Sequence, residues 1–328
     1  MKLSYGQLWA ILILYRVFTT ICSDTGYSLT QMAGSILCIV LQLIIILPVI
    51  SIYKHKKISP DTLGGKKIIF SLIFLFMGII SFARIINISG AENASENGYI
   101  FLIIFLSVVS LYCSKLGIKA AGRCAVMAFG LFIFCFAVLL LSSHSGIKIS
   151  NISVLNDGNG VFYYALREFA DSSEILALFA LPMFVETSKR KGIYIYFASR
   201  LVLTGVISLL GSAVLGKVSA ISDYPFFEIC SFANPFSVQR SDALFIMSYT
   251  LISVVNIAVD LICIDIFSGK CFKYIKLGAV IIMAAGGWLM SRSGIYAAEV
   301  ILIVLFIIAG YTVIVSGHSK KGEKVVRV

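Results

Sequence analysis

Several charged side chains lie inside long apolar stretches of the sequence. Arg16 is in the middle of the first stretch, Arg84 is near the end of the third, and Arg200 and Asp260 lie in later ones. Ionised groups are costly inside a membrane and often bind a solute or carry a proton, so each is a functional candidate. Two have simpler alternatives: Arg84 could reach the outer interface, and Arg200 could pair with an acid such as Asp260 or reach the inner interface.

Arg16 is harder to explain in structural terms. It lies too deep to reach the interface easily, so its guanidinium needs a carboxylate partner. The possible partners are Asp171, Glu174, Asp260 or the carboxylate of a ligand.

A polar break interrupts another apolar stretch, residues 161–185. Ser172, Ser173 and Glu174 stand directly before an apolar run that begins at Ile175. If a helix restarts there, these residues can cap its free N–H groups and complement its dipole. Such a half-helix N-terminus is a common solute site in membrane transporters. The alternative is that these residues mark where a helix enters the membrane from an outer loop.

A second group of polar residues shares one helical spacing. Tyr249, Ser253, Asn256 and Asp260 follow one another at intervals of three or four residues, so they could form a polar stripe that faces inward. The alternative for this stripe is hydrogen bonding between membrane helices.

The elements that position all these residues are expected to be membrane helices. The chain has 328 residues, 59% hydrophobic and 13% charged, with a mean hydropathy of +0.98. A soluble protein of this composition would expose large apolar areas, so we predict one all-α integral membrane domain over residues 1–328. Its ten predicted helices cover about 8–22, 32–53, 68–88, 99–114, 125–141, 161–185, 193–215, 243–266, 277–290 and 295–315.

The net charge of +11 follows the loops between these segments. Lys and Arg gather in every second loop, for example Lys66 and Lys67 after the second segment and Lys189, Arg190 and Lys191 after the sixth. Cytoplasmic loops attract Lys and Arg. The alternation therefore predicts ten spans of a lipid bilayer with both termini in the cytoplasm, and it argues against a nucleic-acid-binding surface.

Residue types that serve catalysis or metal binding show no useful pattern. The eight cysteines are scattered, mostly in apolar runs, and the three histidines lie far apart. A Gly-rich phosphate loop, a serine nucleophile elbow and a zinc-binding HExxH sequence are all missing. We predict that the protein is not an enzyme and uses neither a metal nor a cofactor.

Four short motifs occur in the order in which one known family has them. They are Leu3-Ser4-Tyr5-Gly6-Gln7-Leu8 before the first segment, Glu174 with Pro182-Met183-Phe184 in the sixth, Leu215-Gly216 followed by Tyr224-Pro225 in the next outer loop, and Arg240-Ser241-Asp242-Ala243-Leu244-Phe245 at the start of the eighth. The chain thereby resembles the spore germination permease family. That family supplies the B-type subunit of nutrient germinant receptors and belongs to the amino acid–polyamine–organocation (APC) transporter superfamily.

The resemblance implies a LeuT-like fold, with ten transmembrane helices in a 5+5 inverted repeat and interruptions in helices 1 and 6. It implies a mid-membrane pocket built by the first, third, sixth and eighth helices. The implied ligand is a small nutrient, often an amino acid, that triggers germination. The implied partners are an A-type membrane subunit and a C-type lipoprotein subunit in the spore inner membrane.

On this basis we predict that Arg16 binds a ligand carboxylate, assisted by the N–H groups near Ser172 and Ser173. Glu174 would cap the half-helix or receive an ammonium group. The predicted ligand-binding residues are Arg16, Thr19, Thr20, Arg84, Phe169, Asp171, Ser172, Ser173, Glu174, Tyr249 and Asn256, and the candidate for proton coupling is Asp260.

Two other functions stay open. One is a vegetative secondary transporter of amino acids or organic cations in the bacterial cytoplasmic membrane, with Asp260 or Glu174 as the proton-linked group. The other is a structural subunit whose pocket is vestigial, in which case side chains would fill the space between the first, sixth and eighth helices.

Overall fold

The computed structural model describes residues 3–55, 59–91, 96–152, 159–185, 192–232, 242–269, 274–293 and 296–319. The predicted basic turn at 189–191 and the first two residues of the motif at 240–245 lie outside this part. Within it the secondary structure is helical apart from one isolated bridge between Leu3 and Val185.

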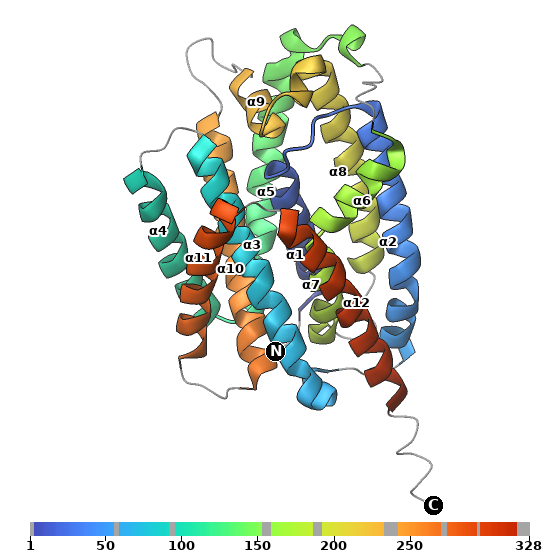
Figure 1. Cartoon of the computed structure of the whole chain (residues 1–328), viewed down its shortest axis with the longest axis vertical. Helices are drawn as coiled ribbons and strands as arrows, with labels where there is room; N and C mark the ends of the chain where they lie inside the picture. The colour runs from blue at the N-terminus through green and yellow to red at the C-terminus, as the bar shows by residue number, and fades with distance from the viewer. Residues whose placement is uncertain are drawn as a thin grey trace, which may run out of the picture.

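Twelve α-helices of the described residues form the bundle (Figure 1). They are α1 Tyr5–Ile21, α2 Leu29–His55, α3 Lys67–Ala91, α4 Glu96–Lys115, α5 Ile118–Ser142, α6 Val161–Asp171, α7 Glu174–Ala180, α8 Gly192–Leu215, α9 Pro225–Phe232, α10 Asp242–Ser268, α11 Ile275–Ser293 and α12 Tyr296–Ser319. The 3₁₀ turns are η1 Pro60–Lys66, η2 Ser143–Gly146, η3 Ile149–Asn151, η4 Leu181–Phe184 and η6 Gly216–Ala220.

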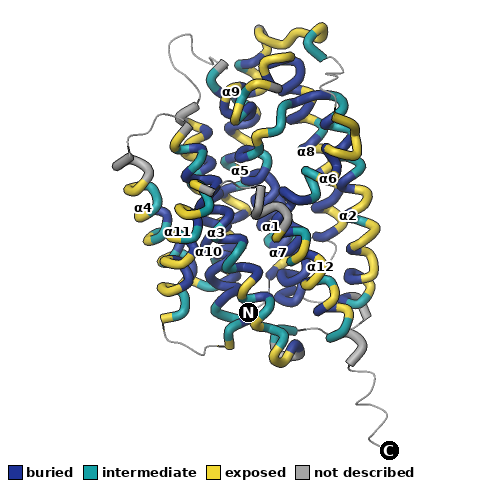
Figure 2. Tube along the Cα trace, viewed as in Figure 1, coloured by how far each residue is buried: buried dark blue, intermediate teal, exposed yellow. Residues whose placement is uncertain are grey.

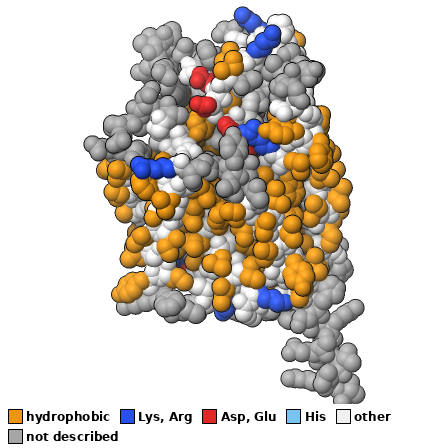
Figure 3. Space-filling model, in the orientation of Figure 1, with side chains coloured by type: hydrophobic (Ala, Val, Ile, Leu, Met, Phe, Trp, Pro, Cys, Tyr) orange, Lys and Arg blue, Asp and Glu red, His pale blue; other side chains and the backbone are white. Residues whose placement is uncertain are grey.

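Six helices of the described part are long and apolar enough to cross a membrane. They cover Leu29–Tyr53, Leu63–Gly90, Ile118–Ser142, Gly192–Ser219, Leu244–Ser268 and Ile275–Arg292. The shorter apolar helices cover Tyr5–Ile21, Ile100–Lys115, Glu174–Phe184 and Ile301–Ser316. Figure 3 shows a broad hydrophobic band around the visible face, with charged side chains above and below it. The protein is a multi-pass membrane protein.

Helices α1 and α10 form the centre of the bundle. Helix α1 packs against α5, α8 and α10, and α10 also contacts α3, α4 and α11. In Figure 2 the middle of the bundle, where α1 and α10 lie, is mainly dark blue, whereas α2, α4 and α12 present exposed residues outward. Their exposed side chains are mainly large and apolar, as a lipid-facing surface requires. The polar residues of α1 and α10 therefore lie away from lipid.

Helix α1 is continuous, so the predicted interruption of the first segment is wrong. The helix starts with a capping box, in which Ser4 and Gln7 each bond to the other's backbone N–H. No Gly or Pro lies between Gly6 and Gly26 to open the backbone, and the helix runs to Ile21. The chain instead becomes non-helical over residues 22–28, before α2 begins.

The predicted interruption of the sixth segment is confirmed. Helix α6 ends at Asp171, Ser172 and Ser173 are non-helical, and α7 starts at Glu174. The interruption leaves two short helices, α6 and α7, whose junction is buried. Helix α9, in contrast, was not predicted. It has only eight residues, and its one sequence signal is Pro225 at the first helical position.

Helices α2 and α6 approach closely at Gly34. A Cβ atom added there would lie 2.8 Å from the carbonyl oxygen of Val161 and 2.5 Å from the Cβ atom of Tyr164. We expect Gly34→Ala to lower the free energy of unfolding by about 1–3 kcal/mol, because the helices must separate. Denaturation in mixed detergent micelles measures this change. Gly205→Ala is the matched control, since nothing lies within 4 Å of its added Cβ, and equal stability of both variants would contradict the prediction.

Candidate functional site

The break between α6 and α7 faces two buried arginines. Glu168 of α6 bridges Arg16 of α1 and Arg200 of α8, with its Oε1 3.3 Å from Nη2 of Arg200. Glu174, the first residue of α7, places its Oε1 3.1 Å from Nη1 of Arg200 and 3.7 Å from Nη1 of Arg16. We call these four residues the central cluster. It joins α1, α6, α7 and α8 in one ionic contact.

The central cluster is electrically neutral and almost completely shielded from solvent. It contains two arginines and two glutamates, and the side chains of Arg200 and Glu174 are both 0% exposed. Burying an unpaired charge would be prohibitive, so the equal numbers of positive and negative groups make this arrangement possible.

Neutral polar groups complete the hydrogen bonding of the cluster. Arg200 donates to Oε1 of Gln42 at 2.5 Å and to Oγ of Ser172 at 3.0 Å. Tyr196 donates its hydroxyl proton to Glu174 at 3.2 Å. The non-helical Ser172 therefore holds Arg200, and it also donates to the carbonyl of Glu168 at 2.6 Å.

This geometry corrects two predictions. Arg200 pairs with Glu168 and Glu174 instead of Asp260, because α8 packs against α1 and α2. Ser173 occupies the N-cap position of α7 but makes no capping hydrogen bond, so the predicted capping role is wrong for it.

Several buried N–H groups of the cluster and of its neighbour Gln42 have no hydrogen-bond acceptor among the described residues. They are Nε and Nη1 of Arg16, Nε of Arg200 and Nε2 of Gln42. The corresponding unpaired acceptor is Oε2 of Glu174. Unpaired donors thus outnumber unpaired acceptors, and an acceptor-rich group such as a carboxylate would satisfy them.

A small cavity adjoins Arg16 on the side of the non-helical stretch 22–28. Its volume is about 20 Å³, and its polar lining includes Thr19, Thr20, Gln31, Glu168 and Asp171. That volume holds about one water molecule. The structure is therefore a closed state, in which a larger ligand can enter only after the surrounding helices separate.

Arg84 forms a second buried ion pair beside this cavity. Its Nη2 lies 2.8 Å from Oδ1 of Asp171, and its Nη1 donates to the hydroxyl of Thr19 at 3.2 Å. These contacts join α3 to the end of α6 and to α1. Arg84 is only 5% exposed, so it does not reach the outer interface, which was the simpler alternative.

The other predicted residues lie in different surroundings. Phe169 packs edge-on against Phe306 of α12, with ring centroids 5.0 Å apart. Tyr249 stacks on Phe18 at 5.6 Å, and Thr20 bonds back to the carbonyl of Arg16. Asn256 and Asp260 lie beside Tyr15, on the α10 side of α1. The structure thus brings Arg16, Thr19, Thr20, Arg84, Asp171, Ser172 and Glu174 together near the break, whereas Asn256 and Asp260 lie on the α10 side of α1.

Three residues were absent from the predicted ligand-binding set, namely Glu168 and Arg200 of the cluster and Gln42, which accepts from Arg200. Each carries a signal in the sequence, because each is a polar residue within a predicted apolar segment. Tyr196 precedes Arg200 by four residues, which places both on one face of α8.

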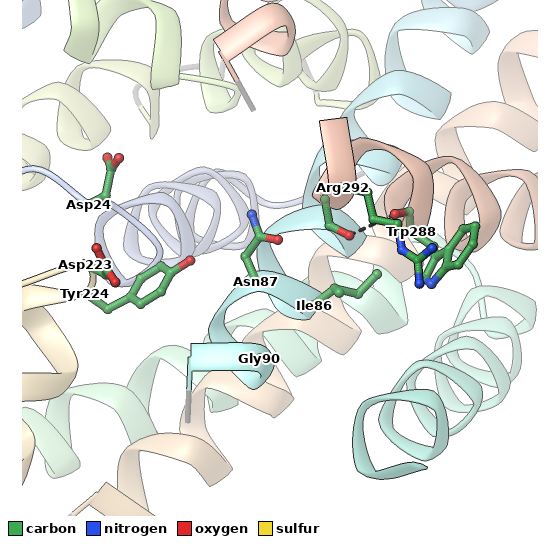
Figure 4. Close-up of a pocket in the computed structure, with 9 residues that line it drawn as sticks. Asp24, Ile86, Asn87, Gly90, Asp223, Tyr224, Trp288 and Arg292 are labelled. Atoms are coloured by element: carbon green, nitrogen blue, oxygen red, sulfur yellow. Dashed lines mark hydrogen bonds between the residues drawn. The ribbon is translucent and has the colours of Figure 1, made fainter. Parts of the chain in front are cut away.

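A larger pocket opens toward one end of the bundle, with a volume of about 470 Å³ (Figure 4). Asp24, Asp223 and Tyr224 lie on one side, and Trp288 and Arg292 lie on the other. Burial, followed by the neighbouring Cys22, Asp24 and Asp223, raises the pKa of Tyr224 to about 12, so its hydroxyl keeps its proton at neutral pH.

This larger pocket is linked to the helix break through Asp24. Asp24 accepts a hydrogen bond of 2.6 Å from Arg167, the neighbour of Glu168 on α6. The pair ties the stretch 22–28 to α6 above the small cavity. Asp24 lines the larger pocket, and its neighbours Ser23 and Thr25 line the small cavity beside Arg16.

Comparison with known proteins identifies the fold. No protein-family model matches the sequence, and no curated protein matches it significantly. Among solved structures, the chain is similar to MHP1, a nucleobase-cation-symport-1 family transporter in a closed conformation with bromovinylhydantoin bound. The TM-score is 0.58 at 11% identity, over 95% of this chain and 77% of that one. The protein therefore has a membrane-transporter fold, and this neighbour is not an enzyme.

Proposed function

We propose that the protein binds a small zwitterion, with an amino acid as the best candidate, between α1, α6, α7 and α8. The observation that carries this proposal is the surplus of buried, unpaired N–H donors on Arg16, Arg200 and Gln42. A ligand carboxylate would accept from these donors when α6 and α7 move away from α1. Glu168, released from Arg16, would then receive the ligand's ammonium group.

Charge balance favours a zwitterion over a simple anion or cation. The central cluster has equal positive and negative charge, and it is shielded from solvent. A ligand with net charge would leave one unpaired charge in the membrane, at a cost of several kcal/mol. An amino acid adds one charge of each sign and keeps the site neutral.

We further propose ten transmembrane helices in a 5+5 inverted repeat, with α6 and α7 together as the sixth. Support comes from the transporter fold and from the break at Ser172 and Ser173, which falls in the first helix of the second half. The alternation of basic loops supports a cytoplasmic location for both termini.

In our proposal the ligand is a nutrient, and the chain is the permease-like subunit of a germinant receptor in the spore inner membrane. The sequence resemblance supports this role, with A-type and C-type subunits as partners. The structure explains the residue type at two positions of the family motif. Gly216 follows the end of α8 with a positive φ of 53°, and Pro225 is the first residue of α9.

A secondary transporter of amino acids or organic cations is the second candidate. The solved neighbour is a transporter that holds a small molecule in a closed conformation. The present structure has a closed centre and a larger pocket of about 470 Å³. A transporter that works by alternating access passes through a closed state of this kind. Uptake of a labelled amino acid into vesicles that contain this chain alone would favour transport, and binding without uptake would favour the receptor.

The experiment that tests the proposed function is thermal unfolding of the purified protein with each common amino acid. A ligand that binds only the folded state at 100 times its dissociation constant should add about 2.7 kcal/mol of stability. We expect stabilisation by a small subset of these compounds. No stabilisation by any of them would contradict the proposal and favour a structural subunit with a vestigial pocket.

A further inference from the structure

Helix α1 carries a second buried polar site where it faces α10. The hydroxyl of Tyr15 lies 2.5 Å from Oδ1 of Asp260 and 3.2 Å from the backbone oxygen of Asn256. Tyr15 is 1% exposed, and both α10 residues are 0% exposed. This site therefore lies in the protein interior, between the two central helices.

Asp260 differs from the carboxylates of the other buried ion pairs. Glu168, Glu174 and Asp171 each lie within ion-pair distance of an arginine, but no ion pair of the described part includes Asp260. The titratable groups beside it are Tyr15 of α1 and Cys263 of its own helix. No described charged side chain of α3, α4, α5 or α11 pairs with it. An isolated carboxylate in such a place is so unfavourable that it takes up a proton instead.

Neighbouring polar atoms are also unpaired. Oδ2 of Asp260 has no hydrogen-bond partner in the described part, and neither do Oδ1 and Nδ2 of Asn256. The two residues are four apart on α10, so they share one face of the helix. A proton on Oδ2 would remove the charge and provide a donor on this face.

We infer that Asp260 is a proton-binding site and that the packing of α1 against α10 depends on this proton. Tyr15 contacts this site, and the next residue, Arg16, belongs to the central cluster. Loss of the proton would leave a carboxylate opposite α1 with only the Tyr15 hydroxyl to stabilise it. The packing of α1 against α10 would then be less stable, and α1 could move. Because Arg16 lies on α1, this movement would change the solute site. This last step rests on the proposed function.

Infrared spectroscopy of the purified protein tests the proton site directly and needs no ligand. We expect a band in the carbonyl region of protonated carboxylic acids at neutral pH, and its complete loss in Asp260→Asn. Asp265→Asn is the matched control on the same helix, because Asp265 is partly exposed and pairs with Lys276 at 3.2 Å. Tyr15→Phe should shift the frequency of the band and keep its intensity. A band that persists in Asp260→Asn, or no band in the wild type, would overturn the inference.

Hydrogen exchange tests the connection to α1. After correction for intrinsic rates, amides of α1 should exchange faster at about pH 9 than at about pH 6 in the wild type. Asp260→Asn, which stays neutral, should abolish this difference. A difference that survives in Asp260→Asn would overturn the link, whereas a failed amino-acid panel with both results intact would reject only the proposed function.

Discussion

Arg200→Met lowers the free energy of unfolding by about 3–5 kcal/mol in our account, the largest stability change expected for any single side chain. Arg200 is fully buried and contacts Glu168 and Glu174. Methionine fills much of the same space, but it leaves the two glutamates with Arg16 as their one remaining cation within the described part. Denaturation in mixed detergent micelles measures the change.

A double variant separates the charge from the packing. Arg200→Met combined with Glu174→Gln restores a balance of one positive and one negative charge, so it should be more stable than Arg200→Met alone. Asp265→Asn, which breaks a partly exposed pair with Lys276, should cost at most about 1 kcal/mol. If Arg200→Met were as stable as this control, the cluster would not be the ionic centre of the bundle.

The second large effect concerns ligand affinity at Arg16. Arg16→Gln should weaken amino-acid binding by about 2–5 kcal/mol, because the ligand carboxylate loses its charged partner in a buried site. Arg16→Lys keeps the charge but lacks the two-pronged donor geometry, so its loss should be smaller. Calorimetry on the folded variants measures both.

The matched control for Arg16 is Arg123→Gln. Arg123 is exposed on α5, so this change removes the same charge at the surface and should leave affinity unchanged. A folded Arg16→Gln protein that binds with wild-type affinity would show that the carboxylate is held elsewhere.

The break in the sixth segment could be predicted because its signal is local. Four successive polar residues, Asp171, Ser172, Ser173 and Glu174, stand inside an apolar stretch. Such a run is costly in a continuous membrane helix, so it indicates an interruption. The cost of a charge inside an apolar segment also indicated Arg16 and Arg84 as functional candidates. Both are now found in buried ion pairs beside this break.

The partners of each charge could not be predicted in the same way. Asp260 and Glu174 were both plausible partners for an arginine, and the choice depends on which helices pack together. Helix α8 lies against α1 and α2, so Arg200 reaches Glu174 and Gln42. Asp260 faces Tyr15 instead, where α10 packs against α1.

The larger pocket could not be predicted from the sequence for a related reason. Its walls come from the 22–28 stretch, α3, the two residues before α9, and α11, which are far apart in the chain. Asp24, Asp223 and Arg292 each look like ordinary loop or helix-end charges in the sequence. Only the packing of the bundle places them around one opening (Figure 4).

Buried N–H groups of Arg16 lack an acceptor within the described part, and in the proposed function a ligand carboxylate supplies it. The most direct measurement compares the affinity of the wild-type protein for its best amino acid with that for the corresponding amino amide, which differs only at the carboxylate. We predict that the amide binds at least about 100-fold more weakly, because it adds a net positive charge and removes the acceptor for Arg16. Equal affinity for the two compounds would contradict the account.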